Sequence, residues 1–506
     1  MPADFCNFLK EKTKKTWMFS FCASVLLGLI AHGYRMLNWL PNWDSLVFRD
    51  DPQQMTGLGR WFLSVASKIS TDYELTWLNG LLALLYISIA SVLLCEIFEI
   101  HSRLAAALLG AVTVTFPCVI STYTYCYVAD AYALSFLLSC VAVYLLTRKE
   151  KRCAIIAVIL LALSMGIYQA YITVAIVLLL CRLIISLYTG QDTVGTSWKK
   201  AAKYLLCGVC AGALYYVVQI GITTVFHIDM LSYQDVSETF SLKDVNILSA
   251  MGSSLYTFKN FFIDFSAGVN LYSVLNCIVF ALLAVGYIAA ARKNIRKISS
   301  AVTVIFYILL IPFGCCALYF ISYNLDYHNL MKMGFFIVYV FLILLYDKFF
   351  QRAFSLWSVA VLCALLVFRF VCIANISYHK LQISFEKSYG LLIRIADRIE
   401  TTPGASSVKR ILVVGAPQNS EDYSVAFPPE ITGTTNGLII RKDDESVGQS
   451  VLTSALQDYC DLSFDFIAGE EAERLKASAT VSDMPCWPEE GSVAVKNDIV
   501  IVNFGR

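Results

Sequence analysis

The sequence has little charge and few histidines. Only 15% of its 506 residues are Asp, Glu, Lys or Arg, and five are His. The 39 basic and 38 acidic residues nearly cancel. Because phosphate backbones are bound by a clustered excess of Lys and Arg, this balance argues against nucleic acid as a partner. The histidines are dispersed, so the sequence predicts no histidine-rich metal site.

Familiar catalytic motifs are absent as well. The chain has no GxSxG elbow, which argues against Ser-His-Asp catalysis, and residues 404–506 have no GxGxxG, Walker or HExxH motif. The 17 cysteines do not form the set of two Cys or Cys/His pairs that a zinc site requires. Only Cys460 and Cys486, both in the polar C-terminal region, are candidates for a disulfide, which is as plausible there as two free thiols. No ligand cluster demands a metal, and we predict no cofactor.

Long apolar runs are what the sequence has in abundance. Hydrophobic residues make up 58% of the chain, and the mean hydropathy is +0.64. A helix that crosses a bilayer requires about 20 mainly apolar residues. By this criterion we predict a polytopic, mainly α protein with about eleven spans: 17–30, 75–95, 104–120, 128–146, 153–167, 170–187, 204–226, 271–291, 301–321, 334–345 and 354–374.

The distribution of Lys and Arg predicts which loops face the cytoplasm. Basic residues are retained in cytoplasmic loops, and here they cluster on one side of the eleven-span arrangement. The basic clusters are at 10–15, 147–152, 199–200, 291–297 and 347–352. We therefore predict a cytoplasmic N-terminus, with the loops 33–74, 121–127, 227–270 and 322–332 facing outward.

The polar stretch 32–61, at the start of the first outward loop, carries several acids between two apolar segments. Charge at the edge of a bilayer is costly to bury and is a functional hypothesis by default. Asp44 is a candidate general base for an acceptor hydroxyl, although an Asp beside Ser also commonly caps a helix. Asp50 and Asp51 are further candidates. Arg60 suits the phosphate of a lipid carrier, although an ordinary snorkelling arginine would look the same.

Other polar residues lie near the predicted span ends. Asp130 is a candidate acid, but a carboxylate in the first turn of a helix is favourable without any catalysis. Tyr168 and Gln169 interrupt a long apolar run and could satisfy one another at a turn. Asp326 and His328 are a titratable pair in an outward loop, or simply solvated residues. The aromatic segment 254–265 predicts either an interfacial amphipathic helix or a surface loop.

The composition changes beyond residue 374. We predict a transmembrane domain over 1–374, an amphipathic connecting helix over 375–403 and a small extracytoplasmic α/β domain over 404–506. The last segment has 16 acids against 8 bases, unlike the basic loops. Its β-like runs are 410–416, 437–441, 464–469 and 492–504, the last of which reads as a hairpin.

Several short segments together resemble the GtrII-type glucosyltransferases of bacteria, which modify O-antigen. They are NWDSL at 42–46, GRWFL at 59–63, WLNG at 77–80, DAY at 130–132 and GIYQA at 166–170. The resemblance covers roughly residues 1–374. It implies a GT-C-like enzyme of the cytoplasmic (inner) membrane of a bacterium, which transfers a sugar, expected to be glucose, from a polyprenyl-phosphate donor to a cell-surface glycan outside.

The resemblance also implies roles for particular residues. Asp44 matches the acid expected as base in the first outward loop, and Asp130 is the second acid. Arg60 and Trp61, with Tyr168 and Gln169, are the expected donor-binding residues. The competing interpretations are a flippase for lipid-linked glycans, an O-antigen polymerase and a non-catalytic scaffold. A flippase would place charges near the middle of spans and often has an internal repeat, neither of which is evident here.

Overall fold

The computed structural model describes most of the chain. The described residues are 14–41, 44–46, 53–68, 74–148, 150–230, 246–266, 268–294, 297–321, 325–349, 353–415, 431, 439 and 445–505. They divide into two compact units. The helical unit comprises 1–37, 52–375 and 426–432, and the C-terminal unit comprises 38–51, 376–425 and 433–506.

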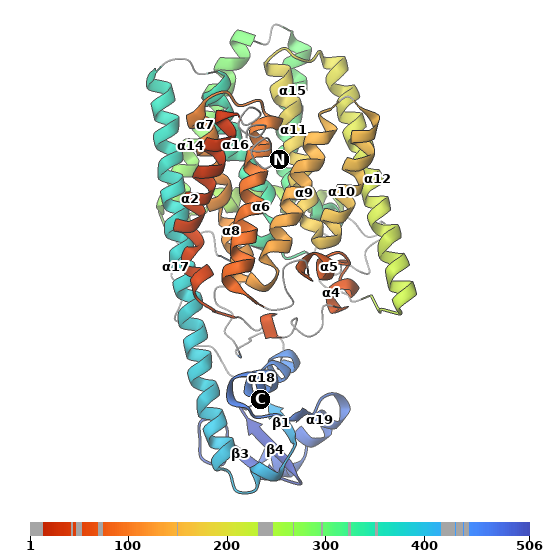
Figure 1. The fold of residues 1–506 in the computed structure, drawn as a ribbon, viewed down its shortest axis with the longest axis vertical. Coiled ribbons are helices and arrows are strands. Elements are labelled where there is room, and N and C mark those ends of the chain that lie inside the picture. Colours follow the sequence, from red (N-terminus) through yellow and green to blue (C-terminus); the bar gives the residue numbers. More distant parts are fainter. Residues whose placement is uncertain are drawn as a thin grey trace, which may run out of the picture. The chain divides into compact units, whose positions relative to one another are not determined.

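The helical unit is a bundle of long helices joined by short helical turns (Figure 1). Its long helices are α2 (Lys15–Leu37), α6 (Thr76–Ile97), α7 (Arg103–Thr115), α9 (Ala129–Leu146), α10 (Lys151–Ile167), α11 (Ile172–Tyr188), α12 (Val194–Phe226), α13 (Ile247–Phe262), α14 (Leu271–Asn294), α15 (Ile298–Cys315), α16 (Ile337–Lys348) and the first half of α17 (Ala353–Thr401). Its short elements are α4 (Gln53–Gly57), α5 (Leu63–Lys68), α8 (Pro117–Thr124), η1 (Cys126–Val128), η2 (Gln169–Tyr171), η3 (Ala317–Phe320), η4 (Asn329–Met331) and η5 (Met333–Phe336).

The mainly α, polytopic architecture is confirmed. Among the described residues, eight helices are long and apolar enough to cross a membrane, or nine if the bent pair α7 and α8 forms one span. Two further segments that we predicted as spans, α10 and α16, are helical but have only 17 and 12 residues. The total of eleven therefore stays a prediction.

Helix breaks follow local chemistry. Pro117 lacks a backbone donor and starts α8, so α7 and α8 meet at a bend of 41°. Tyr168 is extended (φ −157°, ψ 116°) and separates α10 from η2, at the break predicted in the long apolar run. These breaks place short turns, and with them polar side chains, at the ends of the helices.

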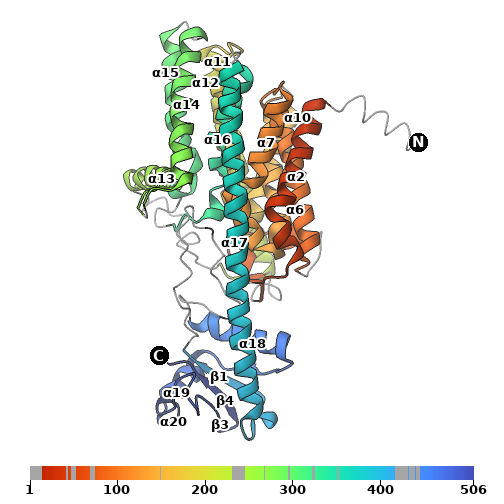
Figure 2. The same ribbon diagram turned by 90° about the vertical axis from the view of Figure 1, so that its left-hand side faces the viewer.

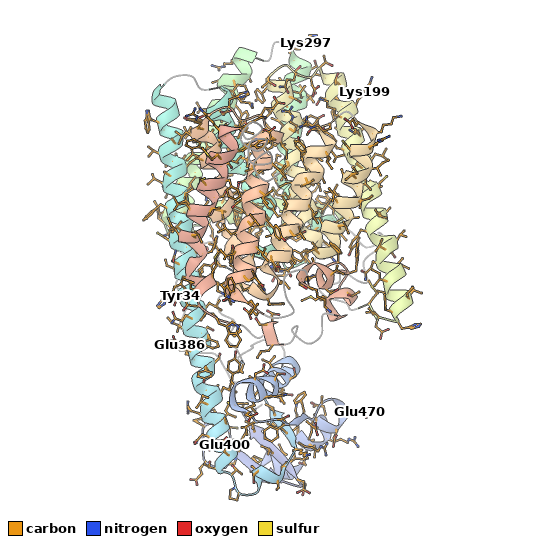
Figure 3. All side chains as sticks on the ribbon, viewed as in Figure 1. Tyr34, Lys199, Lys297, Glu386, Glu400 and Glu470 are labelled. Carbon is orange, nitrogen blue, oxygen red and sulfur yellow. The ribbon has the colours of Figure 1, made fainter. Side chains whose placement is uncertain are left out.

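The two ends of the helical unit differ in chemistry. Lys199 and Lys297 lie at one end, whereas Tyr34 lies at the opposite end (Figure 3). We call these the basic end and the aromatic end. Near the aromatic end, α13 runs across the direction of α14 and α15 (Figure 2). Its residues Leu248 and Tyr256 are 79% and 69% exposed.

The C-terminal unit contains a four-stranded sheet between two helical layers. Its elements are η6 (Ala405–Ser407), β1 (Arg410–Val414), α18 (Glu445–Cys460), β2 (Asp465–Phe466), α19 (Gly469–Lys476), α20 (Ala479–Ser482), β3 (Val493–Lys496) and β4 (Ile499–Asn503), in addition to the second half of α17. The strand order is β2-β1-β4-β3, with β1 parallel to β2 and β4. Alternate residues of β1 and β4 pack against α17 and α18 on one face and against α19 and α20 on the other.

The strand predictions can be compared with this sheet directly. The hairpin of β3 and β4 turns at Asn497 and Asp498, both with positive φ, as a tight hairpin turn requires. The runs 410–416 and 464–469 contain β1 and β2, whereas 437–441 lies outside the described residues apart from Ile439. Cys460 and Cys486 are free thiols in this structure, so the disulfide alternative is not formed.

Candidate functional site

A tight turn after α4 presents Arg60 at the aromatic end of the helical unit. Gly59 has φ +82°, and the Arg60 amide donates to the Met55 carbonyl at 2.9 Å. A Cβ atom at position 59 would lie 2.5 Å from Tyr215 Oη and 2.6 Å from Gln169 Nε2. Both the positive φ and the lack of space therefore require glycine here.

Hydrogen bonds from side-chain amides and a hydroxyl of other segments stabilise this turn. Gln169 Nε2 donates to the Leu58 carbonyl at 2.9 Å and to Tyr215 Oη at 3.0 Å. Tyr215 Oη in turn donates to the Gly59 carbonyl at 2.9 Å, and Gln219 Nε2 donates to a carbonyl of α4, also at 2.9 Å. Carbonyls in α4 and in the turn after it thus accept hydrogen bonds from side chains of η2 and α12.

The residues after Arg60 pack against the end of α10. The Phe62 amide donates to the Gly166 carbonyl at 2.8 Å, and a Cβ atom at 166 would lie 2.7 Å from the Trp61 ring. Trp61 also lies 6.4 Å from the Tyr215 ring, between centroids. The segments GRWFL and GIYQA, which are distant in the sequence, therefore form one packed unit around the turn.

The Arg60 guanidinium lies against two tyrosines. Its Cζ is 4.7 Å from the centroid of the Tyr168 ring, and Nη1 lies 3.4 Å from Tyr132 Oη and 3.6 Å from Met55 Sδ. The Tyr132 and Tyr168 rings stack with centroids 5.1 Å apart. Guanidinium groups stack on aromatic faces and are more weakly hydrated than ammonium groups, so this half-buried position suits arginine better than lysine.

His328 adds a second basic side chain beside Arg60. It precedes η4 in a loop outside the long helices, and its Nδ1 is buried without a hydrogen-bond partner. Burial, together with the positive charges of Arg60 and Lys332, lowers the pKa of His328 to about 3. The imidazole is therefore neutral at physiological pH. Asp326, two residues earlier, is exposed.

Asp130 lies in the first turn of α9 and is 2% exposed. Close to the same end is a buried ion pair, in which Arg35 Nη2 lies 2.7 Å from Glu74 Oε1. Cys126 is within electrostatic range of Arg35, Glu74 and Asp130. The aromatic end therefore holds acidic and basic groups that are largely removed from water. In the part of the chain that the structure describes, no group of three or more His, Cys, Asp or Glu side chains could hold a metal ion.

The remaining predicted residues lie elsewhere. Asp44 is 7% exposed in a short helical turn that belongs to the C-terminal unit, where the neighbouring Leu46 packs into the apolar core. Asp50 and Asp51 lie outside the described residues. The structure thus brings Arg60, Trp61, Tyr168, Gln169 and His328 together in one unit, whereas Asp44 is part of the other.

A family comparison identifies the chain. The model of the family glucosyl transferase GtrII matches residues 33–368, about two thirds of the sequence. The chain belongs to this family. The resemblance inferred from the short segments is confirmed, and this GtrII glucosyltransferase carries Arg60, Asp130 and Gln169 within the matched region. No curated protein and no solved structure matches the chain.

Some residues at the aromatic end of the GtrII glucosyltransferase are not among the site residues predicted from the sequence. Tyr215 and Gln219 stand one turn apart in α12, and polar residues within an apolar run are the signal that could have identified them. Arg35 and Glu74 flank the first outward loop, and nothing in their spacing indicates that they pair. Burial of that ion pair depends on how α2 and α6 pack, which sequence patterns alone do not reveal.

Proposed function

We propose that this GtrII glucosyltransferase takes glucose from a polyprenyl-phosphate donor and transfers it to a cell-surface glycan on the outer side of the cytoplasmic membrane. The family supplies the reaction class, and the long apolar helices suit a lipid-linked donor. The observation that carries the proposal is the half-buried Arg60 guanidinium, which lies against Tyr132 and Tyr168. Arg60 lies between α4 and α5, at the lower end of the helical unit in Figure 1, whereas Lys199 and Lys297 lie at the upper end in Figure 3.

Arg60 is the proposed ligand of the donor phosphate. A planar guanidinium offers paired donors that match phosphate oxygens, and its charge is worth more in a partly dry site than in water. The positive charges of Arg60 and Lys332 both act on His328, and two cations near one imidazole favour an anion there. Trp61 and Gln169 remain donor-site residues in this proposal, and their contacts with the turn make them positioning residues for Arg60.

Asp44 is the proposed base, and Asp130 the second acid. In the proposed step, the base accepts the proton of the acceptor hydroxyl while the hydroxyl oxygen bonds to the anomeric carbon of glucose. The bond from that carbon to the phosphate oxygen breaks, and the polyprenyl phosphate leaves with the electron pair. The configuration at the anomeric carbon is inverted. Arg60 would stabilise the charge that develops on the leaving phosphate.

Turnover by purified protein tests the proposal. The protein in detergent is incubated with polyprenyl-phosphate glucose and with surface polysaccharide from cells that lack it. We expect equal amounts of released polyprenyl phosphate and polysaccharide-bound glucose. Polysaccharide that lengthens without added glucose would instead indicate a polymerase. A parallel assay with the protein reconstituted in lipid vesicles tests for a flippase, which would move the donor across the membrane without releasing polyprenyl phosphate.

Variants of the two acids test their roles separately. General-base catalysis contributes about 10²- to 10⁴-fold, so Asp44→Asn is expected to lower kcat by that amount with the donor KM unchanged. Asp130→Asn tests the second acid in the same assay. Full turnover by Asp44→Asn would remove Asp44 from the base role, and the Asp130 result would then decide whether the base lies in the helical unit.

A further inference from the structure

The C-terminal unit carries a row of aromatic side chains for which the proposed reaction has no use. It consists of Trp39, Tyr459, Tyr389 and Phe385, and we call it the aromatic row. Trp39 and Tyr389 are 49% and 39% exposed, and the other two are half-buried. Three segments contribute to it, namely the stretch after α2, the second half of α17 and the end of α18.

The rings follow one another in close contact. The Trp39 and Tyr459 rings stack with centroids 5.7 Å apart and an interplanar angle of 22°. Tyr459 meets Tyr389 edge-on at 5.9 Å, and Tyr389 stacks on Phe385 at 6.0 Å, one helical turn away on α17. The inner edge of the row packs on the core of the unit, since Phe385 and Tyr459 contact buried residues of α17 and α18. The aromatic row is therefore held in place by the core and exposes aromatic surface on its other side.

Hydrogen-bonding side chains lie beside the aromatic row. On α17, Gln382 Nε2 donates to Glu386 Oε1 at 2.8 Å, and Figure 3 marks Glu386 on this stretch of the helix. Lys387 and Asp458 are exposed beside Glu386 and Tyr459 in the sequence. Amide and carboxylate groups next to an aromatic face provide both hydrogen bonds and stacking.

We propose that the aromatic row binds the glycan acceptor by stacking sugar rings on Trp39 and Tyr389. The C–H face of a pyranose is apolar and slightly positive, and it packs on the negative face of an aromatic ring. The sugar hydroxyls would form hydrogen bonds with the polar side chains beside the aromatic row. A glycan is the occupant that fits because it is the acceptor class of a glucosyltransferase, so this inference rests on the proposed function and names a second contact for its acceptor.

Kinetics with varied acceptor test the row. The full-length protein is assayed with saturating polyprenyl-phosphate glucose and increasing polysaccharide from cells that lack the protein. We expect Trp39→Ala and Tyr389→Ala each to raise the acceptor KM about three- to tenfold with kcat unchanged, since one stacked aromatic pair is worth up to about a factor of ten. Trp39→Phe should recover most of the affinity.

Two controls separate sugar stacking from other apolar contacts. Trp357→Ala removes a tryptophan that is 69% exposed in the first half of α17, and it should leave the acceptor KM unchanged. Trp39→Leu keeps an apolar side chain without a π face. If Trp39→Leu retains the acceptor KM as well as Trp39→Phe does, the row contacts lipid or an apolar protein partner and the inference is overturned.

A binding measurement keeps this inference separate from the proposed function. The same polysaccharide is titrated, without donor, against the wild-type protein and the Trp39→Ala Tyr389→Ala variant by calorimetry. Weaker binding by the variant supports a glycan-binding role for the aromatic row. This holds even if the wild type shows no turnover, because a lack of turnover would overturn only the proposed function. Equal binding by both proteins overturns the glycan-binding role of the aromatic row, even if turnover is normal.

Discussion

The two ends of the helical unit use the same side-chain types in different environments. At the basic end, the exposed Arg148 lies over the Tyr144 ring, with Cζ 4.4 Å from the centroid. At the aromatic end, the half-buried Arg60 lies over Tyr168 at 4.7 Å. The geometry is nearly equal, but water screens the first contact far more than the second. The degree of burial, rather than the residue type or the distance, therefore distinguishes a surface contact from a candidate site.

Ion pairs show the same contrast. Lys14 and Glu96 are 2.7 Å apart with side chains 58% and 19% exposed, whereas Arg35 and Glu74 are also 2.7 Å apart with side chains 0% and 8% exposed. Removing one partner of a buried pair leaves the other charge buried without the carboxylate or cation that faced it. An exposed partner is simply hydrated. Four substitutions test this comparison, in order of decreasing expected effect.

The largest effect is expected from Glu74→Ala. The substitution leaves the Arg35 guanidinium charged in a buried position, which costs about 3–5 kcal/mol of unfolding free energy. The measurement is denaturant or thermal unfolding in detergent. Glu99→Ala is the matched control, because Glu99 pairs with Arg182 at the basic end and is 46% exposed, so we expect less than about 1 kcal/mol. Equal losses in the two variants would contradict the comparison.

Arg60→Ala should act on turnover rather than on folding. Loss of one charge-stabilising donor typically lowers kcat about 10²- to 10³-fold, and we expect the lower end of this range. Arg148→Ala, the matching contact at the basic end, should leave kcat unchanged. Arg60→Lys retains the charge but not the planar stacking, so its activity should fall between the two. If Arg148→Ala were as inactive as Arg60→Ala, stability would be the shared cause.

His328 makes stability depend on pH. Its pKa is lowered from 6.5 to about 3 in the folded protein, so the unfolded chain takes up the proton first as the pH falls. The stabilisation is therefore complete above pH 6.5 and is lost as the pH falls below it. Between pH 6.5 and 5 we expect a loss of about 2 kcal/mol, which His328→Gln should abolish. Replacing the exposed His101 with Gln should leave the pH profile unchanged.

Lys14→Ala should have the smallest effect. Exposed ion pairs contribute about 0.2–1 kcal/mol, and Glu96 retains a hydrogen bond from Trp17 Nε1 at 2.6 Å. We expect a change in the unfolding midpoint close to the measurement error and further reduced by salt. A loss as large as that of Glu74→Ala would mean that charges at the basic end are also effectively buried.

Part of the candidate site could be predicted from the sequence. Arg60, Tyr168 and Gln169 were singled out because polar residues are rare in and beside membrane spans, and the structure brings them together. Their individual tasks could not be assigned. Gln169 donates its amide to the turn that presents Arg60, a contact between segments more than a hundred residues apart. Sequence spacing carries no information about such pairs, because they depend on how whole helices pack.

The sequence by itself determined the helical architecture and the hairpin of the C-terminal unit. Apolar runs of span length favour helices in lipid whatever their neighbours are, and Asn-Asp suits a tight turn locally. Only the tertiary structure decided that Asp44 belongs to the C-terminal unit and that Arg35 is buried with Glu74. Periodic patterns report local preferences, whereas the burial and pairing of single charges depend on contacts between distant segments.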